Sequence, residues 1–419
     1  MLILYLILLL SCNLGLIEIL GFSISISKMI IDLLVLLFFS RSLYLHVFQY
    51  NSHYNFWGWQ YIIFYIFITL ISFIVNQTSI INLILFLEVV LIPYLLFLAV
   101  INSSFSTKYI KFLSRIFFFV LILQIPVIII KFLFIGINES GAVGTFSVNN
   151  GNLSTLIPMI CISICLIYYY LFEKYRSLFM IPFFVFFGII GNKLAILFMI
   201  PLIYLIVTLI YNFINSKRDL GKIVLNLFSV FIISVISFYF MIIFSPRINA
   251  TSNNIIDSAT EYISDYLSRD KYRDRENKLS RLTAFPIVVN FIKENKPLIG
   301  NGPGVILKSG LTGQSGNLRK TKYNLGYGSK LGIFWFSIQI GILGFLPILL
   351  FLIAIMRHSW KKLYYNQISN QLFFPFVGFM IGVTILYDII LYSNTSFLHP
   401  TIMTIFMIIS GINLNRYSN

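Results

Sequence analysis

The chain has 419 residues, of which 58% are hydrophobic and 11% are charged, and its formal net charge is +16. A soluble domain has too little interior to hide that much apolar surface, so the composition excludes a soluble protein and predicts a chain embedded in lipid. What the positive charge means depends on which side of the membrane each Lys and Arg lies.

Apolar stretches of about 20 residues recur along the chain, and this is the length that a helix needs to cross the ~30 Å hydrocarbon core of a bilayer. They predict an all-α, polytopic membrane protein with about twelve spans, at residues 2–20, 24–40, 57–75, 79–100, 110–135, 153–172, 177–190, 193–214, 221–245, 330–356, 371–391 and 397–414.

Two of these predicted spans need comment. The first, 2–20, has neither a basic segment before it nor a cleavage site of small residues, so we expect it to remain as an anchor. The seventh and eighth share one apolar stretch that is interrupted at Gly191-Asn192-Lys193. They are either two short tilted helices or one span with a re-entrant turn.

The basic residues of the connectors predict the orientation, because cytoplasmic connectors retain Lys and Arg. With the N-terminus inside, the inner connectors carry thirteen of these residues, and the short outer side carries three: Lys28, Lys131 and Lys193. Both termini are therefore predicted to be cytoplasmic. Residues 246–329 then form a large extracytoplasmic loop, flanked by spans one to nine (1–245) and ten to twelve (330–419).

This loop region is the most polar part of the chain. Residues 245–330 hold 14 of the 30 Lys and Arg and 7 of the 14 Asp and Glu. Nucleic acid is an unexpected partner for a basic surface outside the cell, whereas an anionic, lipid-linked substrate at the outer leaflet fits. We expect short helices within the loop.

One sequence pattern stands out in the loop. Arg281 precedes a short apolar segment, which ends in Lys296-Pro-Leu-Ile-Gly-Asn-Gly-Pro-Gly304. The glycines do not form a nucleotide loop, since they lack the Lys-Ser/Thr of a P-loop and the G-x-G-x-x-G spacing. They are either a tight turn or a place where backbone amides approach a phosphate.

This arrangement resembles the bacterial O-antigen polymerase and O-antigen ligase superfamily, of the Wzy type. That family combines about twelve spans, a large outer loop and a loop arginine followed by P-L-x-G-x-G-x-G. Gly144-Thr-Phe-Ser-Val-Asn149-Asn150 is similar to the family's outer G-x-F…N segment, and Gly191-Asn-Lys193-Leu-Ala195 lies where the family often has Ser-Arg-Gly or Ser-Arg-Ala.

The sequence departs from the family in two places. Lys193 replaces an arginine, which keeps the charge but loses bidentate phosphate geometry. The His-Asn pair that ligases carry after the glycines is absent, and the corresponding stretch begins at Lys322. The second departure favours a polymerase over a ligase.

The resemblance implies a GT-C-like, membrane-embedded glycosyltransferase that polymerises repeat units of a surface polysaccharide, such as an O-antigen of lipopolysaccharide. Its substrate would be an oligosaccharide on a polyprenyl diphosphate such as undecaprenyl diphosphate, in the inner membrane of a bacterium. Membrane lipid and a chain-length regulator protein are the further partners expected. A ligase of the same superfamily and a flippase of lipid-linked oligosaccharide remain the alternatives.

The expected chemistry needs fixed cations near the bilayer surface, because negative charge grows on the leaving diphosphate. Arg281 is the first candidate, since its planar group can bind two diphosphate oxygens at once. Lys193 is the second. Gly300, Gly302 and Gly304 are the candidates for backbone contacts to the diphosphate. Without an H-E-x-x-H motif or a cysteine pair, we expect no metal and no cofactor.

An acceptor hydroxyl also needs a general base or an orienting acceptor. His399, at the outer start of the last span, is the histidine placed to supply it, or else a plain interface residue. Asp388, near the outer end of span eleven, is the carboxylate alternative. Glu88 lies mid-span, where a charge costs about 2.5–3.5 kcal/mol, so it is protonated, paired or functional.

Overall fold

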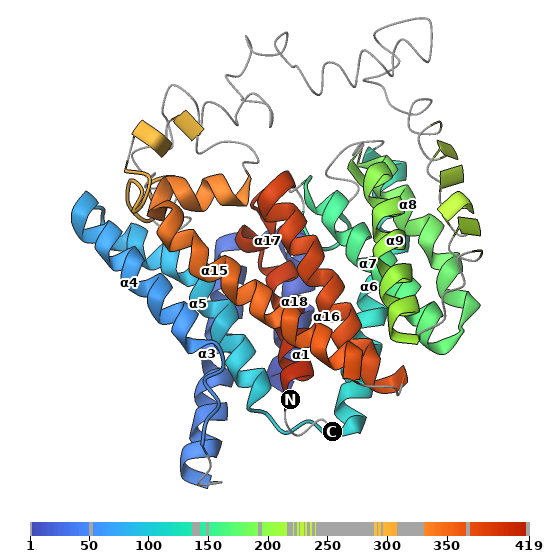
Figure 1. The fold of residues 1–419 in the computed structure, drawn as a ribbon, viewed down its shortest axis with the longest axis horizontal. Helices are drawn as coiled ribbons and strands as arrows, with labels where there is room; N and C mark the ends of the chain where they lie inside the picture. The colour runs from blue at the N-terminus through green and yellow to red at the C-terminus, as the bar shows by residue number, and fades with distance from the viewer. Residues whose placement is uncertain are drawn as a thin grey trace, which may run out of the picture.

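A computed structural model of the chain describes residues 2–49, 53–135, 143–147, 151–191, 195–215, 221, 224–225, 227–229, 231–232, 235–236, 239, 289–290, 292–294, 296–307, 331–365 and 369–415 (Figure 1). The helices are α1 (Leu2–Cys12), α2 (Leu14–Ile19), α3 (Ile24–Tyr44), η1 (Leu45–Gln49), α4 (Trp59–Asn76), α5 (Ile80–Ile101), α6 (Thr107–Ile135), α7 (Leu153–Phe172), η3 (Tyr175–Met180), α8 (Ile181–Ile190), α9 (Ala195–Asn215), α15 (Gly332–Tyr365), α16 (Ser369–Tyr387), η4 (Asp388–Tyr392), α17 (Thr395–Leu398) and α18 (Pro400–Leu414). No strand occurs among these residues, which confirms the all-α class.

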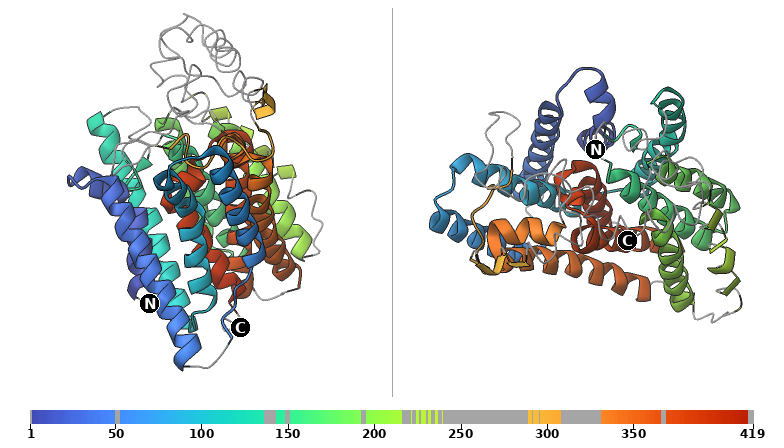
Figure 2. Two further views of the ribbon diagram at one scale, coloured as in Figure 1. Left: turned by 90° about the vertical axis from the view of Figure 1, so that its left-hand side faces the viewer. Right: turned by 90° about the horizontal axis from the view of Figure 1, so that it is seen from above.

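The long helices lie side by side in one bundle, seen from two further directions in Figure 2. Both chain ends lie at one end of the bundle, which we call the termini end. Helix α17 and the described residues 289–307 lie at the opposite end, which we call the loop end (Figure 1).

Seven of the described helical segments are long and apolar enough to cross a membrane: Ile24–Phe48, Trp59–Asn76, Ile80–Ile101, Lys108–Phe134, Leu153–Phe172, Gly332–Tyr365 and Gln371–Tyr392. Four further apolar helices are shorter, at Leu2–Cys12, Tyr175–Ile190, Met199–Ile214 and Pro400–Leu414. A multi-pass membrane protein is therefore supported, whereas twelve complete spans are not seen. Most of the predicted ninth span, 221–245, lies outside the described residues.

Helix α18 lies at the centre of the bundle, packed against α5, α16 and α1. Its residues from Thr401 to Leu414 are all buried. Small side chains permit this close packing, as at Gly411, where a Cβ would lie 2.7 Å from the Val100 side chain of α5. A bundle held by small residues and close backbone contact is typical of helices that associate in lipid.

The seventh and eighth predicted spans form two separate helices, and residues 192–194 between them lie outside the described part. Helix α8 has only 10 residues and so rises about 15 Å, which is half of the hydrocarbon core. Gly188 of α8 lies against Ile196 of α9, where a Cβ would meet the Ile196 side chain at 2.5 Å. The chain therefore turns back close to itself at this point.

Three predicted spans are interrupted at the loop end. The first breaks at Asn13, which separates α1 from α2. The tenth bends at Gly341, whose φ of 70° and ψ of −178° are not helical. The twelfth divides at His399 into α17 and α18. In membranes, interrupted helices occur where other protein groups satisfy the freed backbone atoms, so these breaks mark the place to look for a site.

Candidate functional site

Residues Pro297–Gly304, here called the glycine turn, lie against the bend of α15. The amide of Ile342 donates a hydrogen bond to the Pro297 carbonyl at 3.0 Å, just past Gly341. A Cβ on Gly341 would overlap the Leu298 carbonyl. The bend and the turn therefore supply each other's hydrogen bonds and fit together only because Gly341 has no side chain.

The amides of the three candidate glycines all donate within the protein. Gly300 donates to the Lys296 carbonyl at 2.8 Å, and Gly302 donates to the Gln339 carbonyl at 2.8 Å. Gly304 donates to Oε1 of Gln339 at 3.1 Å. Their positive φ angles, 68°, 108° and 77°, explain the residue type. The observed role of these glycines is to dock the turn, and contact of their amides with a diphosphate stays a prediction that requires these bonds to open.

The end of α4 completes this docking site. Asn76 donates from Nδ2 to the Gly300 carbonyl at 3.1 Å, and it accepts a hydrogen bond from Lys296 Nζ at 2.8 Å. Ser72 donates to the Gln339 carbonyl at 3.2 Å. The buried polar groups of the turn and of α15 are thus paired, as a low-dielectric environment requires.

The first part of α15, Gly332–Ile340, here called the α15 arm, connects the glycine turn to η4 and α17. The amide of Gly332 donates to the Ser393 carbonyl at 3.0 Å. The rings of Phe336 and Phe397 meet edge to face, with centroids 5.0 Å apart. The α15 arm is one short helix that contacts both segments, so a displacement of the glycine turn would shift residues 388–399.

Asp388 is completely buried at the start of the π-helical turn η4. Its Oδ1 accepts a hydrogen bond from the Ser393 hydroxyl, and its Oδ2 accepts one from the Ser396 amide at 2.6 Å. Ser396 lies in the first turn of α17, so the carboxylate caps that helix. Both carboxylate oxygens therefore have donors from the same short segment.

His399 follows directly on α17 and is buried. Its ring forms a hydrogen bond with the backbone of Phe146, while Nδ1 has no hydrogen-bond partner. His399 directly follows α17, and the carboxylate of Asp388 caps the beginning of that helix. The free ring nitrogen leaves His399 able to bind a hydroxyl.

The segment Val143–Ser147, part of the G-T-F-S stretch, enters the bundle beside His399. The Thr145 hydroxyl donates to the Cys12 carbonyl at 2.9 Å, and the Thr145 amide donates to Gln124 Oε1 at 2.8 Å. The carbonyl of Thr145 accepts from the Gly15 amide at 2.8 Å. The break at Asn13 is thereby explained, because the interrupted backbone pairs with this inserted segment.

Helix α7 ties the same region together. Asn152 donates from Nδ2 to the Thr395 hydroxyl at 3.1 Å, and the hydroxyls of Thr155 and Tyr392 lie 2.8 Å apart. Residues 143–147, 151–155 and 388–399, with the partners named above, form what we call the polar corner. Buried hydroxyls, an amide, a carboxylate and an imidazole meet in it at the loop end.

Glu88 is paired, which resolves one of the choices that the sequence leaves open. Its Oε1 forms an ion pair with Lys28 Nζ, and Asp32 forms a side-chain hydrogen bond with Glu88. Lys28 and Asp32 are one turn apart on α3 and meet Glu88 of α5. These three residues line a cavity of about 30 Å³, together with residues of α17 and α18 that include Leu398. Pairing is what makes charges tolerable at this depth.

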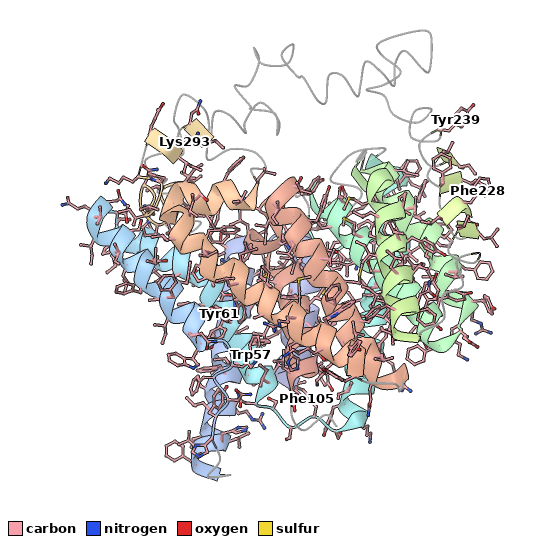
Figure 3. The ribbon with its side chains drawn as sticks, viewed as in Figure 1. Trp57, Tyr61, Phe105, Phe228, Tyr239 and Lys293 are labelled. Carbon is pink, nitrogen blue, oxygen red and sulfur yellow. The ribbon has the colours of Figure 1, made fainter. Side chains whose placement is uncertain are left out.

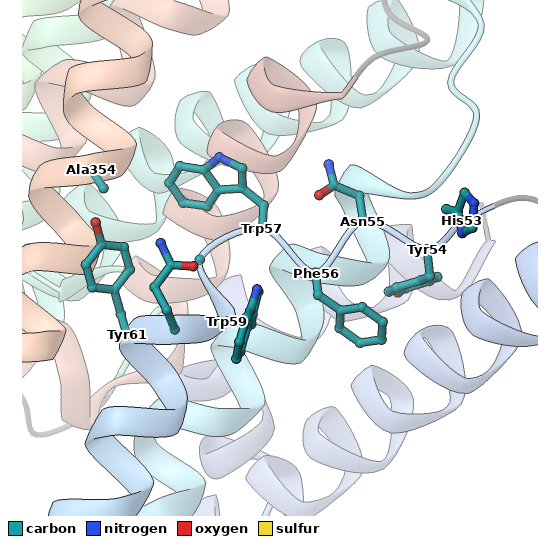
Figure 4. Close-up of a pocket in the computed structure, with 10 residues that line it drawn as sticks. His53, Tyr54, Asn55, Phe56, Trp57, Trp59, Tyr61 and Ala354 are labelled. Carbon is teal, nitrogen blue, oxygen red and sulfur yellow. The ribbon is translucent and has the colours of Figure 1, made fainter.

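A cavity of about 580 Å³ lies away from the polar corner. It is lined by the connector before α4, the first turn of α4 and one residue of α15: His53, Tyr54, Asn55, Phe56, Trp57, Gly58, Trp59, Gln60, Tyr61 and Ala354 (Figure 4). Figure 3 places Trp57 and Tyr61 on the flank of the bundle, far from Lys293 at the loop end. A cluster of Trp and Tyr side chains is typical of the interface between membrane and water.

Two predicted site residues, Arg281 and Lys193, lie outside the described residues. Of the others, the structure brings Asp388 and His399 together around α17, and it links them to the glycine turn through the α15 arm. Gln339 and Thr145 are buried polar residues that sequence reasoning missed. A glutamine and a glycine two positions apart in an apolar stretch, as at Gln339 and Gly341, are the signal that could have found the bend.

Within the described residues, no group of three His, Cys, Asp or Glu side chains could hold a metal ion. No protein-family model matches this chain, and no curated protein matches it. The resemblance therefore depends on the motifs quoted above.

Proposed function

We propose that this protein is a polymerase of lipid-linked oligosaccharide repeat units in a bacterial inner membrane, with both termini cytoplasmic. It would transfer a glycan from polyprenyl diphosphate to the end of another lipid-linked repeat unit. The acceptor hydroxyl forms a new C–O bond to the anomeric carbon, and the bond from that carbon to the diphosphate oxygen breaks. The electron pair leaves with the diphosphate, and the hydroxyl proton passes to a base.

One observation supports this proposal above the others. Three stretches that carry the family resemblance or its expected site residues are far apart in sequence, yet they meet at the loop end. Residues 143–147 contact His399, residues 388–399 contact the α15 arm, and the arm binds the glycine turn. Convergence of separate segments on one polar corner is the usual arrangement of an active site on a rigid scaffold.

The roles proposed for the residues follow from charge and position. Arg281 and Lys193 would stabilise the diphosphate as its charge grows. His399 would bind the acceptor sugar through its free Nδ1. Asp388, with both oxygens bonded, would fix the geometry of α17 and so the position of His399. No metal is needed for a leaving group that is already a stabilised anion.

The test is deletion of the gene, with the surface polysaccharide resolved by length beside the complemented strain. A polymerase predicts collapse of the ladder to one repeat unit on its normal acceptor. Complementation with Arg281→Ala should leave that collapse in place, although the variant inserts into the membrane normally. Bare acceptor with long polymer still on the carrier lipid would indicate a ligase, and lipid-linked units trapped on the inner leaflet would indicate a flippase. An unchanged ladder would overturn the proposal.

A further inference from the structure

We propose that Glu18 is the general base that takes the proton from the acceptor hydroxyl, an inference that rests on the proposed function. Glu18 lies on α2, at the loop end of the bundle, beside the inserted segment Val143–Ser147. In the sequence it is notable as a carboxylate inside the first predicted span, 2–20, and it belongs to no motif.

The backbone contacts place Glu18 next to the polar corner. The amide of Gly15 donates to the Thr145 carbonyl at 2.8 Å, and a Cβ on Gly15 would lie 2.8 Å from the backbone of Ser147. Gly15 and Glu18 are three residues apart on one helix, so they share a face. The carboxylate of Glu18 therefore faces the same inserted segment whose Phe146 backbone binds His399.

A lysine that binds the same segment supports this placement. Lys131 of α6 donates from Nζ to the Gly144 carbonyl at 2.6 Å, and Glu18 is its charge partner. The ammonium group balances the carboxylate charge without closing a direct ion pair among the described residues. Glu18 therefore has a positive charge nearby and still has a carboxylate oxygen that can accept a proton.

The oxygen Oε2 of Glu18 is buried and has no hydrogen-bond partner. A buried carboxylate oxygen without a hydrogen-bond donor is rare. Such an oxygen indicates a bound molecule that supplies the missing donor. Two other buried or partly buried carboxylates of the described residues already have partners: Asp388 accepts from Ser393 and Ser396, and Glu88 binds Lys28. Within the part of the chain that the structure describes, Glu18 is thus a half-buried carboxylate whose inward oxygen is left to accept a proton.

The step that follows is balanced. The acceptor hydroxyl would donate its proton to Glu18 Oε2 as its oxygen bonds to the anomeric carbon of the donor. The bond between that carbon and the diphosphate oxygen would break, and its electron pair would leave with the diphosphate. Glu18 would then return the proton to water before the next turn of the cycle. General-base catalysis of this kind contributes about 10²–10⁴-fold to a rate.

The experiment uses the purified full-length protein in lipid nanodiscs, with a lipid-linked repeat unit as both donor and acceptor. Glu18→Gln should lower kcat by about 10²–10³-fold, with little change in KM and in the temperature of unfolding. Glu18→Asp should lose less. Glu294→Gln is the matched control, because Glu294 is an exposed carboxylate at the same end, and it should behave as wild type.

A second measurement separates catalysis from structure. Added formate should restore part of the activity of Glu18→Ala, because a small carboxylate can take the vacated place, whereas a purely structural role would give no rescue. Full activity of Glu18→Gln, or absence of rescue, would overturn the assignment of Glu18 and leave the polymerase standing. Absence of polymer from the wild-type protein would overturn both proposals.

Discussion

Gly300 and Gly341 occupy adjoining space so closely that a Cβ on Gly300 would lie 2.6 Å from the amide nitrogen of Gly341. The two glycines come from different parts of the chain and make one joint. Gly300 belongs to the turn that resembles a family motif, whereas Gly341 belongs to an apolar span in which a glycine is easily overlooked. The joint fixes the α15 arm, and through it the position of α17.

We predict that Gly341→Ala will lower the free energy of unfolding by about 3 kcal/mol or more. The new methyl group meets the Leu298 carbonyl, and the backbone conformation is one that only glycine adopts readily. Gly21→Ala is the control, since Gly21 has a φ of 91° with nothing within 4 Å of the added carbon. It should cost only about 1 kcal/mol. If denaturant titrations show that the two variants lose equal free energy of unfolding, the close contact between Gly341 and the glycine turn does not contribute to stability.

We predict that Asp388→Asn will act on stability more than on chemistry. An asparagine side chain presents an NH₂ group to one of the donors, Ser393 or Ser396, so one hydrogen bond is lost. The expected cost is about 1.5–3 kcal/mol, as for bonds to a charged group. Activity per folded molecule should fall less than about tenfold, which is far less than the effect expected of a general base. A loss of several hundredfold at unchanged stability would instead make Asp388 catalytic.

We predict that Lys28 and Glu88 are energetically coupled. Lys28→Met and Glu88→Gln each leave a charge without its partner at membrane depth, so each should destabilise the protein. The double variant should be more stable than the sum of the two effects allows, with a coupling energy of about 0.5–3 kcal/mol. Additive effects in a double-mutant cycle would mean that the ion pair contributes nothing.

We predict that the cavity lined by residues 53–61 and Ala354, here called the aromatic recess, marks the membrane interface at the flank of the bundle. Trp57 and Trp59 line it, and the only other tryptophans are Trp335 and Trp360. A variant with Trp335→Phe and Trp360→Phe reports on the recess alone. Its fluorescence should be quenched more by lipids brominated near the headgroup than by lipids brominated near the end of the acyl chain. The opposite order would place the recess deeper in the bilayer.

The helical class and most helix positions were predictable because apolar stretches of spanning length leave few alternatives. The breaks were not, since Asn13 and His399 interrupt apolar runs for a tertiary reason. At Asn13 the distant Thr145 pairs with the backbone of Cys12 and Gly15, and at His399 the ring binds the backbone of the distant Phe146. Hydropathy records how much apolar surface a stretch has, and it carries no information about which carbonyl a distant amide will reach.

The candidate site was predictable in part. His399 and Asp388 were found because each is a group able to accept a proton at the predicted outer end of a span. Glu18 was passed over, because its interest comes from an oxygen that lacks a donor, and only the folded structure shows that. The glycine turn was predicted, but its amides turned out to bind α15, so that the same residues have a structural role in the observed conformation.

The ion pair between Lys28 and Glu88 has a consequence for how the protein is made. Lys28 and Asp32 emerge from the ribosome with α3, about 60 residues before their partner on α5. At a synthesis rate of roughly 5–20 residues per second, α3 waits for several seconds with Lys28 and Asp32 near each other but without Glu88. We therefore expect α3 to be retained at the insertion machinery, or shielded by it, until α5 arrives and the two helices leave for the lipid together.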